Sequence, residues 1–214
     1  MVDDLLDAAV PKGSMEVIGE LAAALPGRLT CRLLGFPEEH WLGVKRWSEQ
    51  MMRYDRVMAD PVAAQEMGEA ITEFASVLLP LAEERRGCPM NDLVSVWANA
   101  EFDGRRYEPN NLIDETGLFI SGGAETTRTV IARSLIAFAE HPEQWAMLAD
   151  NDDLAPRAVE EAMRYFGAVR GTARFASVDI EYKGVLFPAG TFMAVGLAEA
   201  NRDDTVFRQP EVFD

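Results

Sequence analysis

The feature that most constrains this chain is a long helical pattern, from about residue 110 to 141, whose centre holds small and polar residues. Apolar residues recur along it at helical spacing, at Leu112, Ile113, Phe119, Ile120, Val130, Ile131, Leu135 and Phe138. Between them stands Gly122-Gly123-Ala124-Glu125-Thr126-Thr127. Each glycine inside a helix costs about 0.5 to 1 kcal/mol relative to alanine, and a glycine pair is a recognised cause of helix kinks. The segment therefore predicts a long helix whose central glycines lower its stability but leave space beside the backbone.

Helical patterns also fill the rest of the first 166 residues. Apolar periodicity predicts helices over residues 15–34, 41–58, 61–86 and 92–99, and a later helix over about 153–166. After residue 170 the pattern changes to short alternating runs joined by glycine-containing turns, which predicts small strands between about 170 and 200. The expected fold class is mainly α with a small β portion, in a single domain over residues 1–214.

Composition excludes several classes of function. A formal net charge of -16 argues against nucleic-acid and anionic-membrane partners, because both attract clustered Lys and Arg. Cys31 and Cys88 lie far apart, and His40 and His141 are the only histidines, so neither a disulfide framework nor a zinc site is expected. The acidic N-terminus does not resemble a secretory signal, and no apolar run reaches the length of a transmembrane helix. We therefore expect a cytoplasmic protein.

The glycine pair has two interpretations. If Thr126 faces a buried site, helical spacing places Gly122, Gly123, Phe119 and Val130 on the same face, where a small diatomic molecule could approach bare backbone. Alternatively, the glycines permit close helix packing, and the Thr126 hydroxyl bonds back to a carbonyl one turn earlier. A phosphate-binding loop is disfavoured because the GxxxxGK[ST] pattern is absent.

Two motifs at a characteristic separation resemble the cytochrome P450 family. The run Gly122-Gly123-Ala124-Glu125-Thr126-Thr127 is similar to that family's oxygen-activating helix, and Glu161-Ala162-Met163-Arg164 is similar to its Glu-x-x-Arg. The resemblance extends over essentially the whole chain and is strongest to soluble bacterial members. Further matching segments include Leu33-Leu34-Gly35-Phe36-Pro37, Phe187-Pro188-Ala189-Gly190 and Ala200-Asn201-Arg202-Asp203.

The resemblance implies a role for each matching residue. Thr126 would hydrogen-bond the oxygen bound to haem iron, Glu125 would help deliver protons, and Gly122 and Gly123 would open a groove for oxygen. Glu161 and Arg164 would support the fold beneath the haem. Arg174 would contact a haem propionate. The substrate pocket would be lined by Phe119, Val169 and Thr172.

The resemblance also implies a cofactor, substrates and a partner. The complete enzyme would bind haem b and insert one oxygen atom from O2 into a lipophilic small molecule. Its electrons would come from a ferredoxin or flavodoxin-type protein.

The chain departs from the family in several places. Relatives bind haem iron through a cysteine in a Phe-x-x-Gly-x-x-x-Cys-x-Gly loop, which these 214 residues do not contain. Neither Cys31 nor Cys88 has the matching context, so no metal ligand is assigned. Val212 stands where many relatives have the third member of a Glu/Arg/Arg cluster.

We therefore expect an incomplete, truncated P450-like domain, without the family's N-terminal region, that does not turn over by itself. The alternative is a haem-free helical binding or interaction module, or a truncation product without function.

Overall fold

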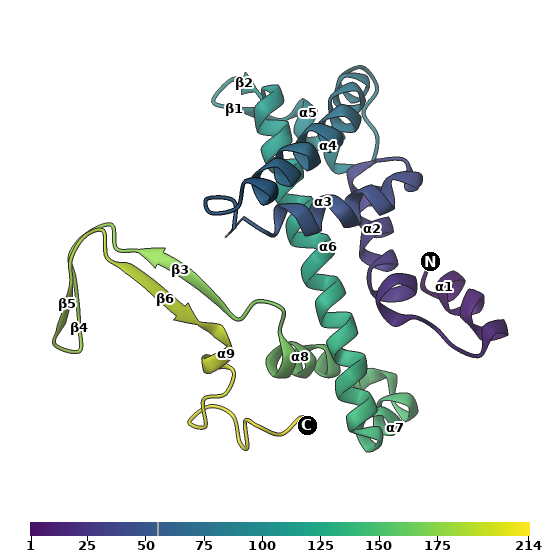
Figure 1. Ribbon diagram of the computed structural model, residues 1–214, viewed down its shortest axis with the longest axis vertical. Helices are drawn as coiled ribbons and strands as arrows, with labels where there is room; N and C mark the ends of the chain where they lie inside the picture. Colours follow the sequence, from purple (N-terminus) through teal and green to yellow (C-terminus); the bar gives the residue numbers. More distant parts are fainter. Residues whose placement is uncertain (55) are drawn as a thin grey trace. The chain divides into compact units, whose positions relative to one another are not determined.

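The computed structural model describes residues 1–54 and 56–214, apart from the side chain of Phe102, and it is mainly helical with small antiparallel sheets (Figure 1). The chain divides into two compact units, residues 1–129 and 130–214, and the boundary falls within helix α6, Pro109–Glu140. Among the described residues, no helix is both long and apolar enough to cross a membrane.

The first unit is built from helices. They are α1 (Val2–Ala9), the 3-10 turn η1 (Val10–Lys12), the π-helical turn η2 (Ile18–Ala22), α2 (Ala24–Leu34), the 3-10 turn η3 (Glu38–His40), α3 (Trp41–Met51), α4 (Pro61–Gly87), α5 (Leu93–Asn99) and the part of α6 up to residue 129. A small hairpin of β1 (Glu101–Phe102) and β2 (Arg105–Arg106) precedes α6.

The core of this unit lies where α2, α3, α4, α5 and α6 meet. Its largest fully buried apolar side chains are Phe74, Leu34, Leu78, Leu112 and Ile120. Burying side chains of this size contributes about 1.5 to 3 kcal/mol each. The apolar face of α6 is therefore anchored in the core over its first three turns.

A buried ion pair joins α4 to the start of α5. Arg85 Nε donates to Asp92 Oδ2 at 2.8 Å, and the two side chains are only 8% and 5% exposed. Asp92 also caps α5 by accepting from the Ser95 N–H at 2.6 Å. Gly35 makes this possible, because its φ of +83° ends α2 and an added Cβ would lie 2.5 Å from Asp92 Oδ2.

The predicted helix over 41–58 is wrong in its second half. Helix α3 ends at Met51, and the following residues form turns, with residue 55 outside the described residues. Met58 is 95% exposed, so its apolar character contributed to the periodicity without being buried. Asp60 then caps α4 through the Val62 N–H, and Pro61 occupies the first helical position.

The second unit combines short helices and two-stranded sheets. After the end of α6 come α7 (Pro142–Asp150), the 3-10 turn η4 (Asp152–Leu154), α8 (Ala155–Phe166), β3 (Gly171–Phe175), β4 (Ile180–Tyr182), β5 (Val185–Phe187), β6 (Phe192–Gly196) and α9 (Leu197–Ala200). Strand β3 pairs antiparallel with β6, and β4 with β5. All strands after residue 170 thus fall in the range that the sequence predicts.

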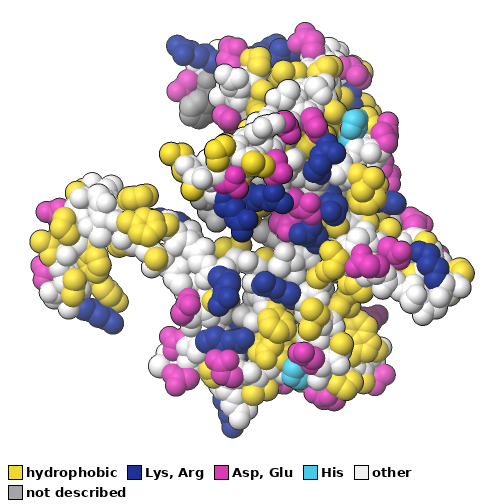
Figure 2. All heavy atoms as spheres, viewed as in Figure 1, with side chains coloured by type: hydrophobic (Ala, Val, Ile, Leu, Met, Phe, Trp, Pro, Cys, Tyr) yellow, Lys and Arg dark blue, Asp and Glu magenta, His cyan; other side chains and the backbone are white. Residues whose placement is uncertain are grey.

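An aromatic cluster forms the core of the second unit. The ring of Phe213 lies 5.3 Å from that of Phe138 and 5.4 Å from that of Tyr165, and Ala137 and Ala162 are buried beside them. The strands are less covered: Phe175 and Phe192 are 70% and 60% exposed, and Figure 2 shows hydrophobic side chains on the visible face of the strand segment.

Candidate functional site

Helix α6 remains α-helical through the glycine pair, and the two glycines have different surroundings. A Cβ at Gly122 would meet nothing within 4 Å among the described residues. A Cβ at Gly123 would lie 3.5 Å from Thr30 Oγ1 of α2, an ordinary van der Waals distance. Close helix packing therefore does not require glycine at 122, and the helix face is open there.

The Thr126 hydroxyl is fixed beside this open position. Its Oγ1 donates to the Gly122 carbonyl at 2.6 Å, the bond to the preceding turn that the sequence left as an alternative. A threonine hydroxyl has one hydrogen to donate and two lone pairs to accept with. With its hydrogen directed to Gly122, the Thr126 oxygen is oriented to accept a hydrogen bond from a group entering above Gly122.

Glu125 points to a cluster of charged side chains. Its carboxylate forms an ion pair with Arg128 on the same helix, and Arg128 also pairs with Glu49 of α3. Burial raises the pKa of Glu125 above its ordinary value, and the charge of Glu49 adds to this, whereas Arg128 lowers it. Glu125 consequently takes up a proton at higher pH than an ordinary glutamate, although it is paired with Arg128.

Phe119 lies one turn before Gly122 and is half-buried. Its ring packs edge-on against Trp97 of α5, with the ring centroids 6.2 Å apart. Phe119 therefore joins the rim of the first unit's core.

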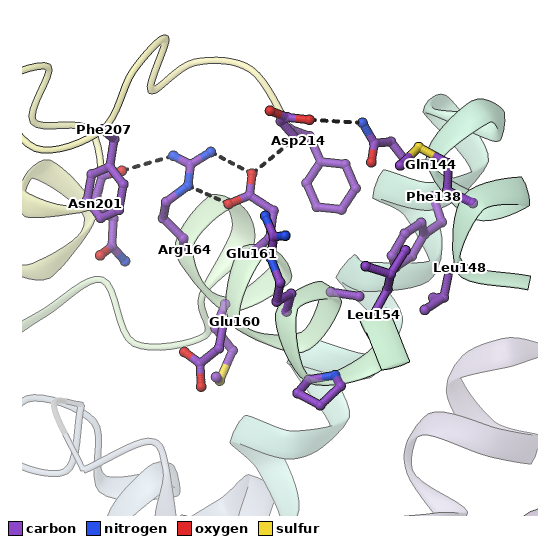
Figure 3. A pocket seen from close by; sticks show the side chains of 16 residues that line it. Phe138, Gln144, Leu148, Leu154, Glu160, Glu161, Arg164, Asn201, Phe207 and Asp214 are labelled. Carbon is purple, nitrogen blue, oxygen red and sulfur yellow. Dashed lines mark hydrogen bonds and ion pairs between the residues drawn. The ribbon is translucent and has the colours of Figure 1, made fainter. Parts of the chain in front are cut away.

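In the second unit, Glu161 and Arg164 of α8 form a hydrogen-bond network in which every N–H of the Arg164 guanidinium has an acceptor (Figure 3). Arg164 Nε and Nη2 donate to the two carboxylate oxygens of Glu161, both at 2.7 Å. The same guanidinium donates to three main-chain carbonyls, those of Asn201 (3.0 Å), Pro210 (2.7 Å) and Val212 (2.7 Å). Hydrogen bonds to Glu161 raise the pKa of Arg164 further above its ordinary value.

Glu161 also binds the end of the chain, because its Oε1 accepts the N–H of Asp214 at 2.9 Å. The side chains of Glu161 and Arg164 are only 16% and 11% exposed, so the pair is more than a surface ion pair. It ties the segment after residue 200 to α8.

Arg202 is a member of this network that sequence reasoning missed. Its Nη1 donates to the Pro210 carbonyl at 2.7 Å and its Nη2 to the Tyr165 carbonyl at 2.9 Å. Its guanidinium also lies 4.4 Å from the centre of the Tyr165 ring. The one available signal was its place in the matching segment Ala200-Asn201-Arg202-Asp203.

The remaining predicted residues lie on or just before β3. Arg174 is exposed, and its Nη1 donates to Thr172 Oγ1 at 3.1 Å and to the Ala173 carbonyl at 2.7 Å. Both acceptors are neutral, and no ion pair of Arg174 is found within the described part of the chain. Val169 is 53% exposed.

The predicted residues are thus brought together in two groups, one in each unit. Gly122, Gly123, Glu125, Thr126 and Phe119 share α6 in the first unit. Glu161, Arg164, Val169, Thr172 and Arg174 belong to the second, where Arg164 hydrogen-bonds to Glu161 and Arg174 to Thr172. The sequence did not point to Glu49 or Arg128, although Arg128 stands three residues after Glu125, a spacing at which helical side chains meet.

The two cysteines do not offer a haem ligand. Cys31 is fully buried in the core, and burial raises the pKa of its thiol to about 12, with Glu38 and Glu39 adding to the effect. Cys88 is exposed directly after α4. Among the described residues, no cluster of three or more His, Cys, Asp or Glu side chains could hold a metal ion. The open position at Gly122 leaves room for a group beside α6, whereas a thiolate ligand for haem iron is not provided by these cysteines.

A pocket of about 650 Å³ adjoins the Glu161–Arg164 network and is the one drawn in Figure 3. Its walls include Phe138, Leu148, Leu154 and Phe207. All five N–H groups of Arg164 are already engaged in internal hydrogen bonds, so this guanidinium is not available to a ligand in the pocket.

Comparison with known proteins identifies the family. The family model described as "Cytochrome P450" matches residues 57–214. The chain is 31% identical to a steroid C26-monooxygenase of Mycobacterium tuberculosis and 34% identical to a nocardicin C N-oxygenase of Nocardia uniformis, covering all of this chain but 58% and 53% of the relatives. It therefore spans about half the length of the curated relatives it matches.

A solved structure gives the same result. The crystal structure of P450BioI in complex with an acyl carrier protein carrying hexadec-9Z-enoic acid matches all of this chain with a TM-score of 0.90 at 30% identity. The chain covers 55% of that protein. The predicted fold, a mainly α P450 fold of which part is present, is confirmed.

Proposed function

The chain belongs to the cytochrome P450 family, and from this premise we propose that it is the oxygen-activating central part of a haem-dependent monooxygenase. The complete enzyme inserts one oxygen atom from O2 into a lipophilic small molecule. The observation that carries the proposal is the open backbone at Gly122 with the Thr126 hydroxyl fixed beside it. We further propose that the two units are parts of one domain, as the match of the whole chain to a single solved structure supports.

Haem, when bound, supplies the iron at which dioxygen is activated and the reducing electrons are received. Thr126 and Gly122 then have complementary roles. Gly122 leaves the space for a small ligand. The Thr126 oxygen accepts a hydrogen bond from that ligand, while the Thr126 hydroxyl continues to donate to the Gly122 carbonyl. A proton on the ligand is thereby held in a defined position.

Glu125 supplies the proton. Its buried setting raises its pKa above the ordinary value, and its side chain is 19% exposed, so water can exchange protons with it. Glu125 and Thr126 are adjacent in sequence and point to different sides of α6. A short chain of water molecules is therefore the route we propose between the Glu125 carboxyl and the groove above Gly122.

The second unit supports the cofactor and the substrate. Glu161 and Arg164 hold the fold on the side of the haem, and Arg174 pairs with a haem propionate. Within the described residues, the Arg174 guanidinium donates to neutral acceptors, which supports an anionic partner for it. Phe119, Val169 and Thr172 line the substrate pocket in this proposal.

The proposed partners are an electron donor and a lipophilic substrate. Relatives are named for oxidation of a steroid and of nocardicin C, and one is solved with a fatty acyl chain on its carrier protein. These substrates differ widely, so the proposal is limited to the class of lipophilic small molecules. A ferredoxin or flavodoxin-type protein supplies the electrons.

The 214 residues alone are expected to be inactive, because neither Cys31 nor Cys88 provides the iron ligand. The test is to mix the chain with haemin, reduce it under carbon monoxide and record the Soret band. We expect no band at the thiolate position. The DNA flanking the coding region should be read for a Phe-x-x-Gly-x-x-x-Cys-x-Gly frame, and the extended polypeptide should give the thiolate band.

Two outcomes would contradict the proposal. A strong thiolate-type band from the 214 residues alone would contradict the proposal that they lack the thiolate ligand. An extended polypeptide with the cysteine loop but without the band would refute the monooxygenase function. If the 214-residue chain and the extended polypeptide both fold cooperatively but do not bind haem, the result would instead support a helical binding module. A molten chain would support a truncation product.

A further inference from the structure

Arg128 of α6 is shared between two carboxylates that come from different helices. Its Nη2 donates to Glu125 one turn earlier on α6, and its Nη1 donates to Glu49 of α3. The three side chains are between 19% and 30% exposed, so solvent screens their interaction only in part. One guanidinium therefore divides its positive charge between two carboxylates, each of which is bound by a different nitrogen.

Lys45 makes the sharing unequal. Its Nζ lies 2.9 Å from Oε1 of Glu49, the same oxygen that Arg128 binds. Within the described residues, Glu49 therefore contacts two cations directly, whereas Glu125 contacts one, which it shares with Glu49. Lys45 and Glu49 from α3 and Arg128 from α6 are the charged groups that face Glu125 within the described residues.

The two carboxylates respond oppositely to this setting. Burial opposes ionisation of Glu49, yet hydrogen bonds from Lys45 and Arg128 outweigh it and lower its pKa. For Glu125, burial dominates and its pKa is raised. Glu49 thus keeps its charge and its hold on Arg128 over the pH range in which Glu125 takes up a proton.

We propose that Glu49 is a positioning residue for proton delivery: by sharing Arg128 with Glu125 and placing a second negative charge nearby, it keeps the Glu125 carboxyl able to hold and release a proton. The inference rests on the proposed role of Glu125 as proton donor. It adds a specific function for a residue of α3 that lies 79 positions earlier in the sequence than Arg128. Without Glu49, Arg128 would bind Glu125 alone and hold it in the ionised state.

The test is a pH titration of the Glu125 carboxyl by NMR in the full chain with 13C-labelled glutamate, the signal being assigned by its loss in Glu125→Gln. In Glu49→Gln the titration midpoint of Glu125 should shift to lower pH, because repulsion is lost and Arg128 is released to Glu125. In Arg128→Met the midpoint should shift to higher pH. Glu66→Gln is the matched control, since it removes a carboxylate bound to Arg53 at 2.6 Å and should leave the midpoint unchanged.

A second variant separates contact from charge. Glu49→Asp keeps the negative charge but shortens the side chain by one methylene, so its hold on Arg128 is weakened and the Glu125 midpoint should again fall. A midpoint that stays or rises in both Glu49→Gln and Glu49→Asp, with helical circular dichroism retained, overturns the proposal. The titration needs no haem, so its failure is distinguishable from failure of the monooxygenase function, which the carbon monoxide spectrum tests.

Discussion

Two of the chain's Glu-x-x-Arg tetrapeptides, the one that begins at Glu125 in the first unit and the one that begins at Glu161 in the second, have the same spacing and different surroundings. In α8, Arg164 binds Glu161 with two of its donors, and its other contacts are with the carbonyls of Asn201, Pro210 and Val212. These acceptors belong to the main chain, and the folded backbone fixes their positions. The α8 pair is therefore part of the architecture.

In α6, the partners of Arg128 within the described residues are side-chain carboxylates, Glu125 and Glu49. Carboxylates can be protonated and can compete for one guanidinium, which carbonyls fixed in a backbone cannot do. The comparison teaches that in both tetrapeptides the spacing brings the glutamate and the arginine together as an ion pair. The groups around the arginine decide whether that pair stabilises the fold or changes the proton affinity of the glutamate.

The largest expected difference between the two pairs is in stability. Arg164→Met removes five hydrogen-bond contacts of the α8 network and leaves Glu161 partly buried without its cation, which should cost about 3 to 5 kcal/mol. Urea unfolding measures the loss, and amide exchange should accelerate across residues 201–214. Arg157→Met, at an exposed position on the same helix, is the control. Equal effects of the two substitutions would mean that the network does not hold the segment after residue 200.

A smaller loss is expected in α6. Arg128→Met removes an arginine that is 21% exposed and bound only to side chains, so we expect a loss of about 1 to 2 kcal/mol in the free energy of unfolding. Arg53→Met breaks a pair whose arginine is 49% exposed and should cost less than about 1 kcal/mol. If Arg128→Met lowered the free energy of unfolding as much as Arg164→Met, the α6 pair would support the fold as strongly as the α8 pair, and the distinction between the two pairs would be wrong.

Much of the fold could be predicted because it depends on local patterns. The predicted helix over about 110–141 corresponds to α6, Pro109–Glu140, and the one over about 153–166 to η4 and α8. The end of α3 was missed, because Met58 extends the apolar period although it is almost fully exposed. Periodicity reports apolar spacing and cannot distinguish a buried methionine from an exposed one.

The candidate site could be predicted only where residue type carries the chemistry. Arg164 binds the carbonyl of Val212, and every residue type offers that acceptor, so a valine at this position keeps the network connected. Likewise, no pattern links Glu49 to Arg128, because their contact depends on how α3 packs against α6. Long-range contacts of this kind become visible only in the folded structure.

The glycine pair should separate stability from function. Gly122→Ala places a Cβ where no described atom lies within 4 Å, so it should stabilise α6 by about 0.5 to 1 kcal/mol. The same change should hinder ligand access to the groove in the extended enzyme. Gly35→Ala is the contrasting variant, because its φ of +83° and its contact with Asp92 predict a loss of stability. Thermal unfolding measures both, and a loss for Gly122→Ala would show that the position is packed.

The smallest effect on stability is expected at Thr126 itself. Thr126→Val removes a hydroxyl whose bond to the preceding turn adds little to a helix, so the free energy of unfolding should change by less than about 0.5 kcal/mol. Ser134→Ala removes the same kind of bond, to the Val130 carbonyl at 2.7 Å, and should be equally neutral. In the extended enzyme only Thr126→Val should divert reducing equivalents from product to hydrogen peroxide, measured as product formed per electron consumed. An equal loss of coupling in both variants would assign the effect to the helix, and a loss confined to Thr126→Val assigns it to the hydroxyl beside Gly122.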